Sequence, residues 1–267
     1  MTEVVSPTAC GHRGFTQISI LGLPVHMVQI PEVIRLMVDW LVSERNRLHW
    51  IVVADMHGVF EAQKNVEFRR LLQTADLTVP DGISLVWVAR RKGFRLKHRV
   101  SGTDLMRAFF GRAQHSGWKS YFYGDTDRTL RHLVPNLHRE FPGLSIAGSY
   151  SPPFRPLTPA EDRAVIRRIN KAKPDVLWVS LGLPKQEQWI ADHRDQLEVP
   201  LVLGVGAALK FLAGTVRRAP IWIGDCGLEW LWRLAHEPRR LWRRVLIEGP
   251  QFVGHVAVEL AGFRKSS

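Results

Sequence analysis

Short apolar segments alternate with amphipathic segments along most of this chain. The apolar segments end at turn residues, as buried strands do, and hydrophobic residues recur at helical spacing between them. The predicted strands are 17–28 (a pair around Gly22), 50–54, 77–79, 118–123, 144–150, 175–182 and 201–206. The predicted helices include 31–46, one uninterrupted helix from about 58 to 72, 83–91, one that opens with a capping box of Thr158 and Glu161, and 185–197. Such alternation predicts a doubly wound α/β fold, with a mostly parallel sheet and helices on both faces.

The pattern divides the chain into three regions. Residues 1–16 are predicted to be a flexible tail, 17–214 the α/β domain, and 215–267 a C-terminal helical appendage in which Pro238 separates two helices. In the second of these helices arginines lie three and four residues apart on one face, and tryptophans lie among them. The appendage is therefore either a basic amphipathic anchor on anionic lipid or a helical hairpin packed on the core with solvated arginines.

The chain is strongly basic, with a formal net charge of +12 and a pI of about 10.4. This charge predicts a polyanionic partner, which is nucleic acid, an anionic membrane surface or a phosphate-bearing substrate. The two cysteines, Cys10 and Cys226, match neither a disulfide framework nor a metal motif, so we expect a reducing cytosol. The first residues lack the apolar stretch of a secretory signal, and no apolar run reaches the length that a membrane-spanning helix needs.

Polar residues stand where several predicted strands end, and open α/β sheets bind their ligands at that edge. Asp81 follows the strand 77–79, and Gly82 then turns the chain into a helix. Because Asp before Gly is common in turns, Asp81 is either a turn residue or a reactive carboxylate. Asp55 and His57 follow the preceding strand in the same way, and a histidine there is either a satisfied polar residue or part of a site.

A glycine turn further along the chain suits a phosphate-bearing ligand. Gly124 and Asp125 lead into a helix, and the backbone N–H groups of a helix start can face phosphate. Asp125 and Asp127 also form a D-x-D triplet of the kind that holds a divalent metal on a nucleotide-sugar diphosphate, a weaker interpretation of the same turn.

A second glycine turn, at Gly182, precedes a helix that starts with Lys185, Gln186 and Glu187. An amide can bind sugar hydroxyls and an ammonium can bind phosphate, although all three side chains could equally face water. The sequence contains no P-loop, dinucleotide fingerprint, HExxH motif or nucleophile elbow. The kinase, dehydrogenase and hydrolase interpretations therefore lack their usual motifs.

In their order along the chain, these blocks resemble the WecG/TagA/CpsF family of bacterial glycosyltransferases, glycosyltransferase family 26. The resemblance covers about residues 17–250 through ADLTVPDG (75–82), RVSGTDL (99–105), LGLPKQE (181–187), GVGA (204–207), RAP (218–220), GLEWLWRL (227–234) and EPRRLWRR (237–244). It implies an inverting, metal-independent transferase without a cofactor. Such an enzyme moves a sugar from a UDP-sugar to a polyprenyl-diphosphate-linked saccharide in the synthesis of an exopolysaccharide or another cell-surface polymer.

The resemblance also implies roles for individual residues. Asp81 is the expected general base, Arg99 lies near the leaving diphosphate, and Gln186 lies in the sugar pocket. With the strand-end residues, the predicted substrate-binding set is Asp55, His57, Arg99, Gln186, Glu187, Arg233, Arg240 and Arg243. The predicted nucleotide-binding set is Gly124, Asp125, Gly182, Gly204, Gly206 and Lys210, and no metal ligand is expected.

Two positions depart from the family pattern. Asp55 stands where many members have the asparagine of a T-x-N block, and Lys210 stands where an aspartate often follows GVG. Both bear on the donor sugar, which is either of the N-acetylmannosamine type or glucose, as in exopolysaccharide glucosyltransferases of the GumM type.

The implied partners are a UDP-sugar, a polyprenyl-diphosphate-linked glycan acceptor and an anionic membrane surface, with the protein peripheral on the cytoplasmic face of the plasma membrane. No nucleic acid is expected, and a homo-oligomer is left open. The alternative is a basic α/β protein that binds nucleic acid. That protein would bind RNA or DNA with a steep salt dependence, whereas the enzyme would be stabilised by UDP.

Overall fold

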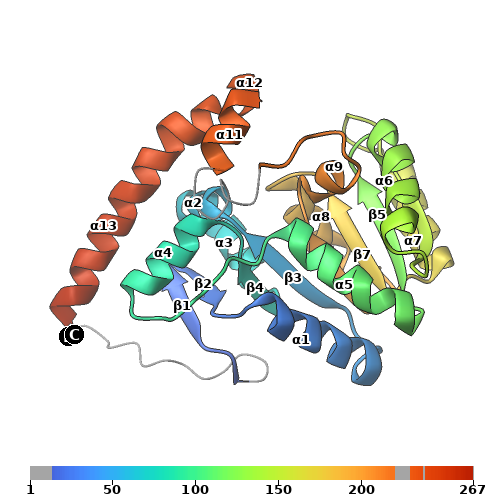
Figure 1. Cartoon of the computed structure of the whole chain (residues 1–267), viewed down its shortest axis with the longest axis horizontal. Helices are drawn as coiled ribbons and strands as arrows, with labels where there is room; N and C mark the ends of the chain where they lie inside the picture. The colour runs from blue at the N-terminus through green and yellow to red at the C-terminus, as the bar shows by residue number, and fades with distance from the viewer. Residues whose placement is uncertain (1–13, 220–228, 237, 267) are drawn as a thin grey trace. The chain divides into compact units, whose positions relative to one another are not determined.

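The computed structural model describes residues 14–219, 229–236 and 238–266 (Figure 1). The chain divides into two compact units, each built from separate stretches of sequence. Unit 1 is Met1–Gln29, Ala54–Val100 and Arg218–Ser267, and unit 2 is Ile30–Val53 and Ser101–Arg217. Residues 1–13 of the predicted tail and both cysteines, Cys10 and Cys226, fall outside the residues that the structure describes.

Six strands form one sheet in the order β4-β3-β8-β7-β5-β6. They are β3 (His49–Ala54), β4 (Leu77–Pro80), β5 (Lys119–Gly124), β6 (Ser145–Tyr150), β7 (Val176–Ser180) and β8 (Leu201–Gly204). From β3 to β6 every neighbouring pair is parallel, with Val176 opposite both Leu201 and Ser120. The predicted α/β fold with a mostly parallel sheet is confirmed.

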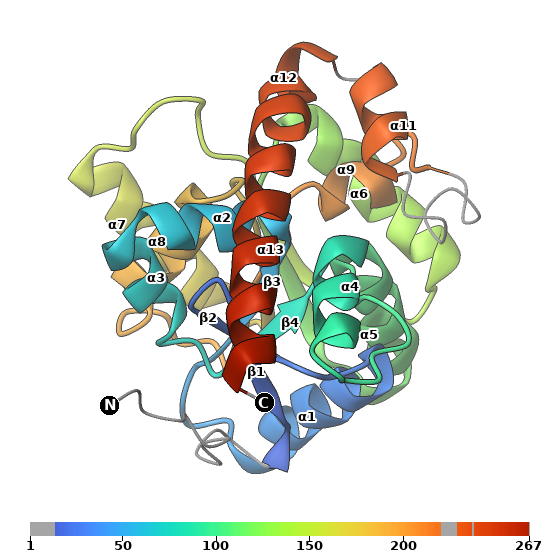
Figure 2. The same cartoon turned by 90° about the vertical axis from the view of Figure 1, so that its left-hand side faces the viewer.

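Unit 2 places helices on both faces of its strands. Figure 2 shows α7 (Pro159–Ala172) and α8 (Lys185–His193) on one side and α1 (Ile30–Ser43), α5 (Gly102–Ser116) and α6 (Asp127–Glu140) on the other. Both faces of these strands are therefore covered, which explains why β3 is buried at all six positions and reads as a continuous apolar run.

Large aromatic side chains fill the core of unit 2. Trp178 on β7 is fully buried and meets Phe109 and Phe110 of α5 edge to face, each with ring centroids 5.5 Å apart. Trp50 on β3 is also fully buried. Truncating one such ring to alanine costs about 3–5 kcal/mol, so these contacts hold α5 on the sheet and keep the strand ends in place.

Local capping signals in the sequence are realised. The Thr158 hydroxyl accepts the Glu161 N–H at 3.3 Å, and the Glu161 carboxylate accepts the Thr158 N–H at 2.8 Å, which is the predicted capping box of α7. Hydrogen bonds from Arg155 and then from Thr158 lower the pKa of Glu161 to about 2. Ser101 caps α5 by accepting the Asp104 N–H.

Unit 1 begins with an antiparallel hairpin, β1 (Gln17–Ile20) and β2 (Leu23–His26), as predicted around Gly22. The prediction of one uninterrupted helix from about 58 to 72 is wrong. This stretch forms two helices, α2 (Met56–Lys64) and α3 (Val66–Leu72). Asn65 between them is extended, and its side chain accepts the Phe68 N–H at 3.0 Å. An asparagine that can cap a new helix therefore ends the old one.

The C-terminal part of unit 1 is helical. It comprises α11 (Glu229–His236), α12 (Pro238–Arg243), the π-helical turn η2 (Arg244–Glu248) and α13 (Gly249–Ser266). Pro238 begins a new helix as predicted, and α12, η2 and α13 follow one another without a break. Among the helices that the structure describes, none is long and apolar enough to cross a membrane.

Helix α13 packs along α2, α4 (Ile83–Arg91) and the β1–β2 hairpin (Figure 1). The Glu259 carboxylate accepts the Leu21 N–H at 2.8 Å and pairs with Lys92, which itself donates to the Ser19 carbonyl at 2.7 Å. Phe252 and Val256 are buried on the same side of α13. Polar and apolar contacts together hold α13 against elements that lie far from it in the sequence.

Candidate functional site

Three of the predicted site residues come together in unit 1 through backbone hydrogen bonds. The Asp81 N–H donates to the Ala54 carbonyl at 2.7 Å, and the Val100 N–H donates to the Pro80 carbonyl at 2.7 Å. Asp55 follows Ala54 directly and Arg99 precedes Val100, so the end of β3, the end of β4 and the RVSG block meet. The structure therefore brings the backbone of a second aspartate and of an arginine to the strand end that carries Asp81.

The turn after Asp81 depends on Gly82. Its φ is +119°, a conformation that side chains other than glycine rarely adopt, and Gly82 stands at the start of α4. Asp81 and Arg99 are both half-buried. A carboxylate in this position lies beside the N-terminus of a nine-residue helix, whose partial positive charge favours the ionised form.

Asp55 caps α2 and also binds a residue of the C-terminal segment. One carboxylate oxygen accepts the Gly58 N–H at 2.9 Å, and the other pairs with the Arg244 guanidinium. Burial alone would raise the pKa of Asp55, but the Arg244 charge, the Gly58 hydrogen bond and the nearby His57 together lower it. The Asp55 carboxylate is therefore ionised and paired.

His57 makes the second link between α2 and the C-terminal segment. Its Nδ1 lies 2.7 Å from a Glu248 oxygen, and both side chains are about one-fifth exposed. Arg244 and Glu248 lie four residues apart in η2, and a π turn places such residues on nearly the same side of the helix. The segment thus presents one cation to Asp55 and one anion to His57.

The arginine of the C-terminal segment that reaches the site is not one of the three that were predicted to bind substrate. Arg243 is exposed, and the side chains of Arg233 and Arg240 lie outside what the structure describes. Arg244, the last residue of the EPRRLWRR block and one without a predicted role, is the arginine that reaches a predicted site residue. Arg244 belongs to the basic EPRRLWRR block, but the spacing of the arginines alone does not show which of them reaches the site.

In unit 2, Gln186 and Glu187 are buried rather than facing water, with exposures of 3% and 1%. The Gln186 amide donates to Glu187 at 2.7 Å and accepts the Gly206 N–H at 3.1 Å. A Cβ on Gly204 would lie 2.8 Å from the Gln186 amide nitrogen, so glycine is needed for this approach. These predicted residues form one hydrogen-bonded group at the end of β8.

The Gly124 turn also depends on close backbone contact. A Cβ on Gly124 would lie 2.3 Å from the Ser180 carbonyl oxygen, and the Asp125 N–H donates to that oxygen at 2.8 Å. The Asp125 carboxylate accepts the Thr126 N–H at 2.8 Å. The turn therefore ties the end of β5 to the end of β7, where parallel sheets of this kind bind ligands.

The remaining predicted residues of unit 2 lie on neighbouring turns. Gly182 has a φ of +79° with open space around the missing Cβ, and Lys210 is half-buried on α9 (Ala208–Leu212). Among the residues that the structure describes, Asp125 and Asp127 belong to no group of three possible metal ligands.

Comparison with known proteins identifies the family. A sequence model of the glycosyl transferase WecG/TagA/CpsF family matches residues 18–266. The chain belongs to the WecG/TagA/CpsF family of glycosyltransferases. The resemblance in the sequence motifs is confirmed, and the match extends through the C-terminal helices as well as the α/β core.

Members of the family in three bacteria carry one name, N-acetylglucosaminyldiphosphoundecaprenol N-acetyl-β-D-mannosaminyltransferase. The Bacillus spizizenii protein is 33% identical over 203 residues, which cover 76% of this chain and 77% of that relative. The Bacillus subtilis protein is 31% identical over 70% of this chain and 71% of the relative. A Staphylococcus aureus protein is 27% identical over 85% of this chain and 87% of the relative.

Proposed function

We propose that this glycosyltransferase is an inverting enzyme that moves a sugar from a UDP-sugar to a polyprenyl-diphosphate-linked saccharide. Relatives that cover most of the chain are named for transfer to a diphosphoundecaprenol-linked acceptor, which supports the acceptor class. The observation that carries the proposal is the meeting of Asp55, Asp81 and Arg99 through the two backbone hydrogen bonds at the ends of β3 and β4. A base and a cation on one strand edge are the groups that this reaction needs.

In the proposed reaction the acceptor hydroxyl attacks the anomeric carbon while UDP leaves from the opposite side. Asp81 takes the proton of the hydroxyl as the new bond forms, which requires an ionised carboxylate within hydrogen-bond reach. The N-terminus of α4 beside Asp81 favours a negative charge there. The Arg99 guanidinium offsets the negative charge that develops on the departing diphosphate. No metal and no cofactor is assigned a part in this transfer.

The polar residues of unit 2 suit the donor nucleotide. The glycine turns at Gly182 and Gly206 leave the backbone open to phosphate, since no atom lies within 4 Å of where a Cβ would be. The Gly124 turn leads into the start of α6, and Lys210 adds a cation. The names of the relatives suggest a donor of the N-acetylmannosamine type. Glucose is the second candidate, since Asp55, which departs from the expected family pattern, is a carboxylate paired with Arg244. A panel of UDP-sugars with a lipid-diphosphate acceptor, followed by product mass, decides between these donors.

We also propose that the protein works as a peripheral protein on the cytoplasmic face of the plasma membrane. The C-terminal segment carries exposed apolar side chains beside its arginines, namely Trp242, Leu246, Ile247, Val253 and Val258. Apolar and basic residues together suit an anionic lipid surface, where a polyprenyl-linked acceptor is held.

The test of the catalytic role is Asp81→Asn, which keeps the shape of the side chain and removes the base. We expect sugar transfer to fall by about 100-fold to 10,000-fold, while the affinity for the UDP-sugar, measured by calorimetry, changes little. Asp195→Asn, an exposed aspartate of unit 2, is the control and should keep full activity. Transfer by Asp81→Asn at the rate of the unmodified enzyme would remove Asp81 from its role.

A further inference from the structure

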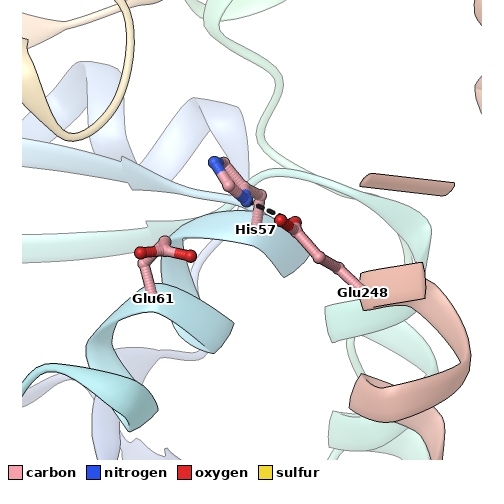
Figure 3. A group of neighbouring side chains, drawn as sticks. All are labelled: His57, Glu61 and Glu248. Atoms are coloured by element: carbon pink, nitrogen blue, oxygen red, sulfur yellow. Dashed lines mark hydrogen bonds and ion pairs between the residues drawn. The ribbon is translucent and has the colours of Figure 1, made fainter. Parts of the chain in front are cut away.

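Three side chains with metal-binding atoms converge between α2 and η2 (Figure 3). His57 and Glu61 lie four residues apart on α2 and so share one face of that helix, and Glu248 approaches from η2. One ligand atom from each residue lies within 4.8 Å of the others. All three side chains are half-buried, so water and ions can reach them.

We propose that His57, Glu61 and Glu248 bind one divalent transition-metal ion, zinc being the best fit, and that the ion fastens the C-terminal segment to α2. Zinc accepts an imidazole nitrogen and carboxylate oxygens at about 2.0–2.2 Å. Modest rotation of the side chains brings atoms within 4.8 Å of one another to those distances. The imidazole selects against magnesium and calcium, which take oxygen ligands. Water completes the coordination.

The charges around the three side chains suit a divalent cation. The two carboxylates supply two negative charges, and the neighbouring Asp55–Arg244 pair is balanced within itself. Lys64 is the competing cation, since its ammonium lies 3.7 Å from the Glu61 carboxylate. The Lys64 side chain is about half exposed and can turn into solvent when the metal binds.

Zinc binding replaces the contact between His57 and Glu248 with two metal–ligand bonds. In the metal-free protein the His57 Nδ1 and a Glu248 oxygen share a hydrogen bond of 2.7 Å. When zinc binds Nδ1, the imidazole hydrogen lies on Nε2, so the histidine binds as the neutral imidazole and Glu248 binds as the carboxylate. The ion then joins two segments whose ligands are 191 residues apart in the sequence. Its role is structural, and the proposed transfer step does not use it.

The test is a zinc titration of the chelator-treated full chain by calorimetry. We expect one tight zinc per chain. Glu61→Gln and Glu248→Gln should each weaken zinc binding by about tenfold or more, since each removes a charged ligand. Glu67→Gln, an exposed glutamate of the neighbouring helix α3, is the matched control and should bind zinc like the unmodified chain.

Glu61→Gln and Glu248→Gln also show whether zinc binds at this site or at other side chains. The chain has eleven histidines, so zinc that binds equally well to the unmodified chain and to both variants lies on other side chains and overturns the proposal. Absence of tight zinc binding overturns it as well. As a second readout, zinc should slow amide hydrogen exchange in residues 244–266 of the unmodified chain and not in Glu61→Gln. Neither measurement uses sugar transfer, so failure here is distinct from failure of the proposed function.

Discussion

Asp55 keeps its negative charge in a half-buried position because three neighbours favour the ionised form. Burial opposes ionisation, but the Arg244 charge, the Gly58 N–H and His57 lower the pKa of this carboxyl below its ordinary value of 3.8. A depressed pKa in the folded state means that the unfolded chain takes up a proton first as the pH falls. The stabilisation from Asp55 is therefore fully present well above pH 3.8 and is lost as the pH falls through the lower pKa of the folded state.

Asp55→Asn should remove this pH-dependent stabilisation and keep the cap on α2, because an amide oxygen can also accept the Gly58 N–H. At neutral pH we expect a loss of about 1 kcal/mol, since both partners of the ion pair are about 30% exposed and water screens them. The loss should shrink toward zero in acid. Urea unfolding of both proteins from neutral pH downward measures it, with the exposed Asp192→Asn as control. A difference that stays constant with pH would contradict the assignment.

The α/β elements were predictable because their signals are local. The helix predicted for 83–91 matches α4 (Ile83–Arg91), and the Thr158 capping box was predicted from two residues three positions apart. Strand-end candidates such as Asp81 and Asp55 follow from the same local pattern. The sequence does not predict the course of the C-terminal helices, because it depends on long-range pairs such as Lys92 with Glu259.

Two residues near the site were missed for the same reason, because their contacts are long-range. Arg244 and Glu248 become notable only when η2 lies beside α2, and nothing in a window of neighbouring residues encodes that approach. The break at Asn65 was missed for the opposite reason, because its signal is local but weak. Asparagine occurs inside helices at a small cost, so only the structure shows that it starts a new one here.

The β5 and β7 strand ends approach so closely that Gly124→Ala should be strongly destabilising. The added Cβ would lie 2.3 Å from the Ser180 carbonyl oxygen, at a φ of +114°. We expect a loss of about 4 kcal/mol or more, because backbone on both sides must move. Gly117→Ala is the matched control, since Gly117 has a φ of +72° and nothing within 4 Å, and should cost about 1–3 kcal/mol. Equal losses in chemical unfolding of the two variants would refute the close contact.

At the scale of the whole molecule, the net charge of +12 and the exposed apolar side chains of the C-terminal segment predict binding to anionic membranes. Charge supplies long-range attraction that salt screens, and apolar side chains supply insertion that salt does not weaken. A protein that uses both should bind vesicles with anionic lipid better than neutral ones and keep part of that binding at high salt.

The triple variant Leu246→Ser, Val253→Ser and Val258→Ser should weaken vesicle binding by about tenfold or more, since each exposed apolar side chain contributes roughly 1 kcal/mol when buried in lipid. These side chains are 61%, 64% and 75% exposed, so folding should be unaffected. Val42→Ser on α1, at a valine that is 67% exposed, is the control. Flotation with phosphatidylglycerol vesicles measures binding, and an unchanged triple variant would exclude this surface.

Unit 1 is assembled from three separate stretches of chain, and the last of them is translated after all of unit 2. Asp55 and His57 leave the ribosome on the order of ten seconds before Arg244 and Glu248, at ordinary rates of synthesis. Throughout that interval the β1–β2 hairpin and helices α2 and α4 lack α13, which covers them in the finished protein. Cellular yield should therefore depend on chaperones that shield nascent apolar surface, and chains that stop before α13 should be insoluble.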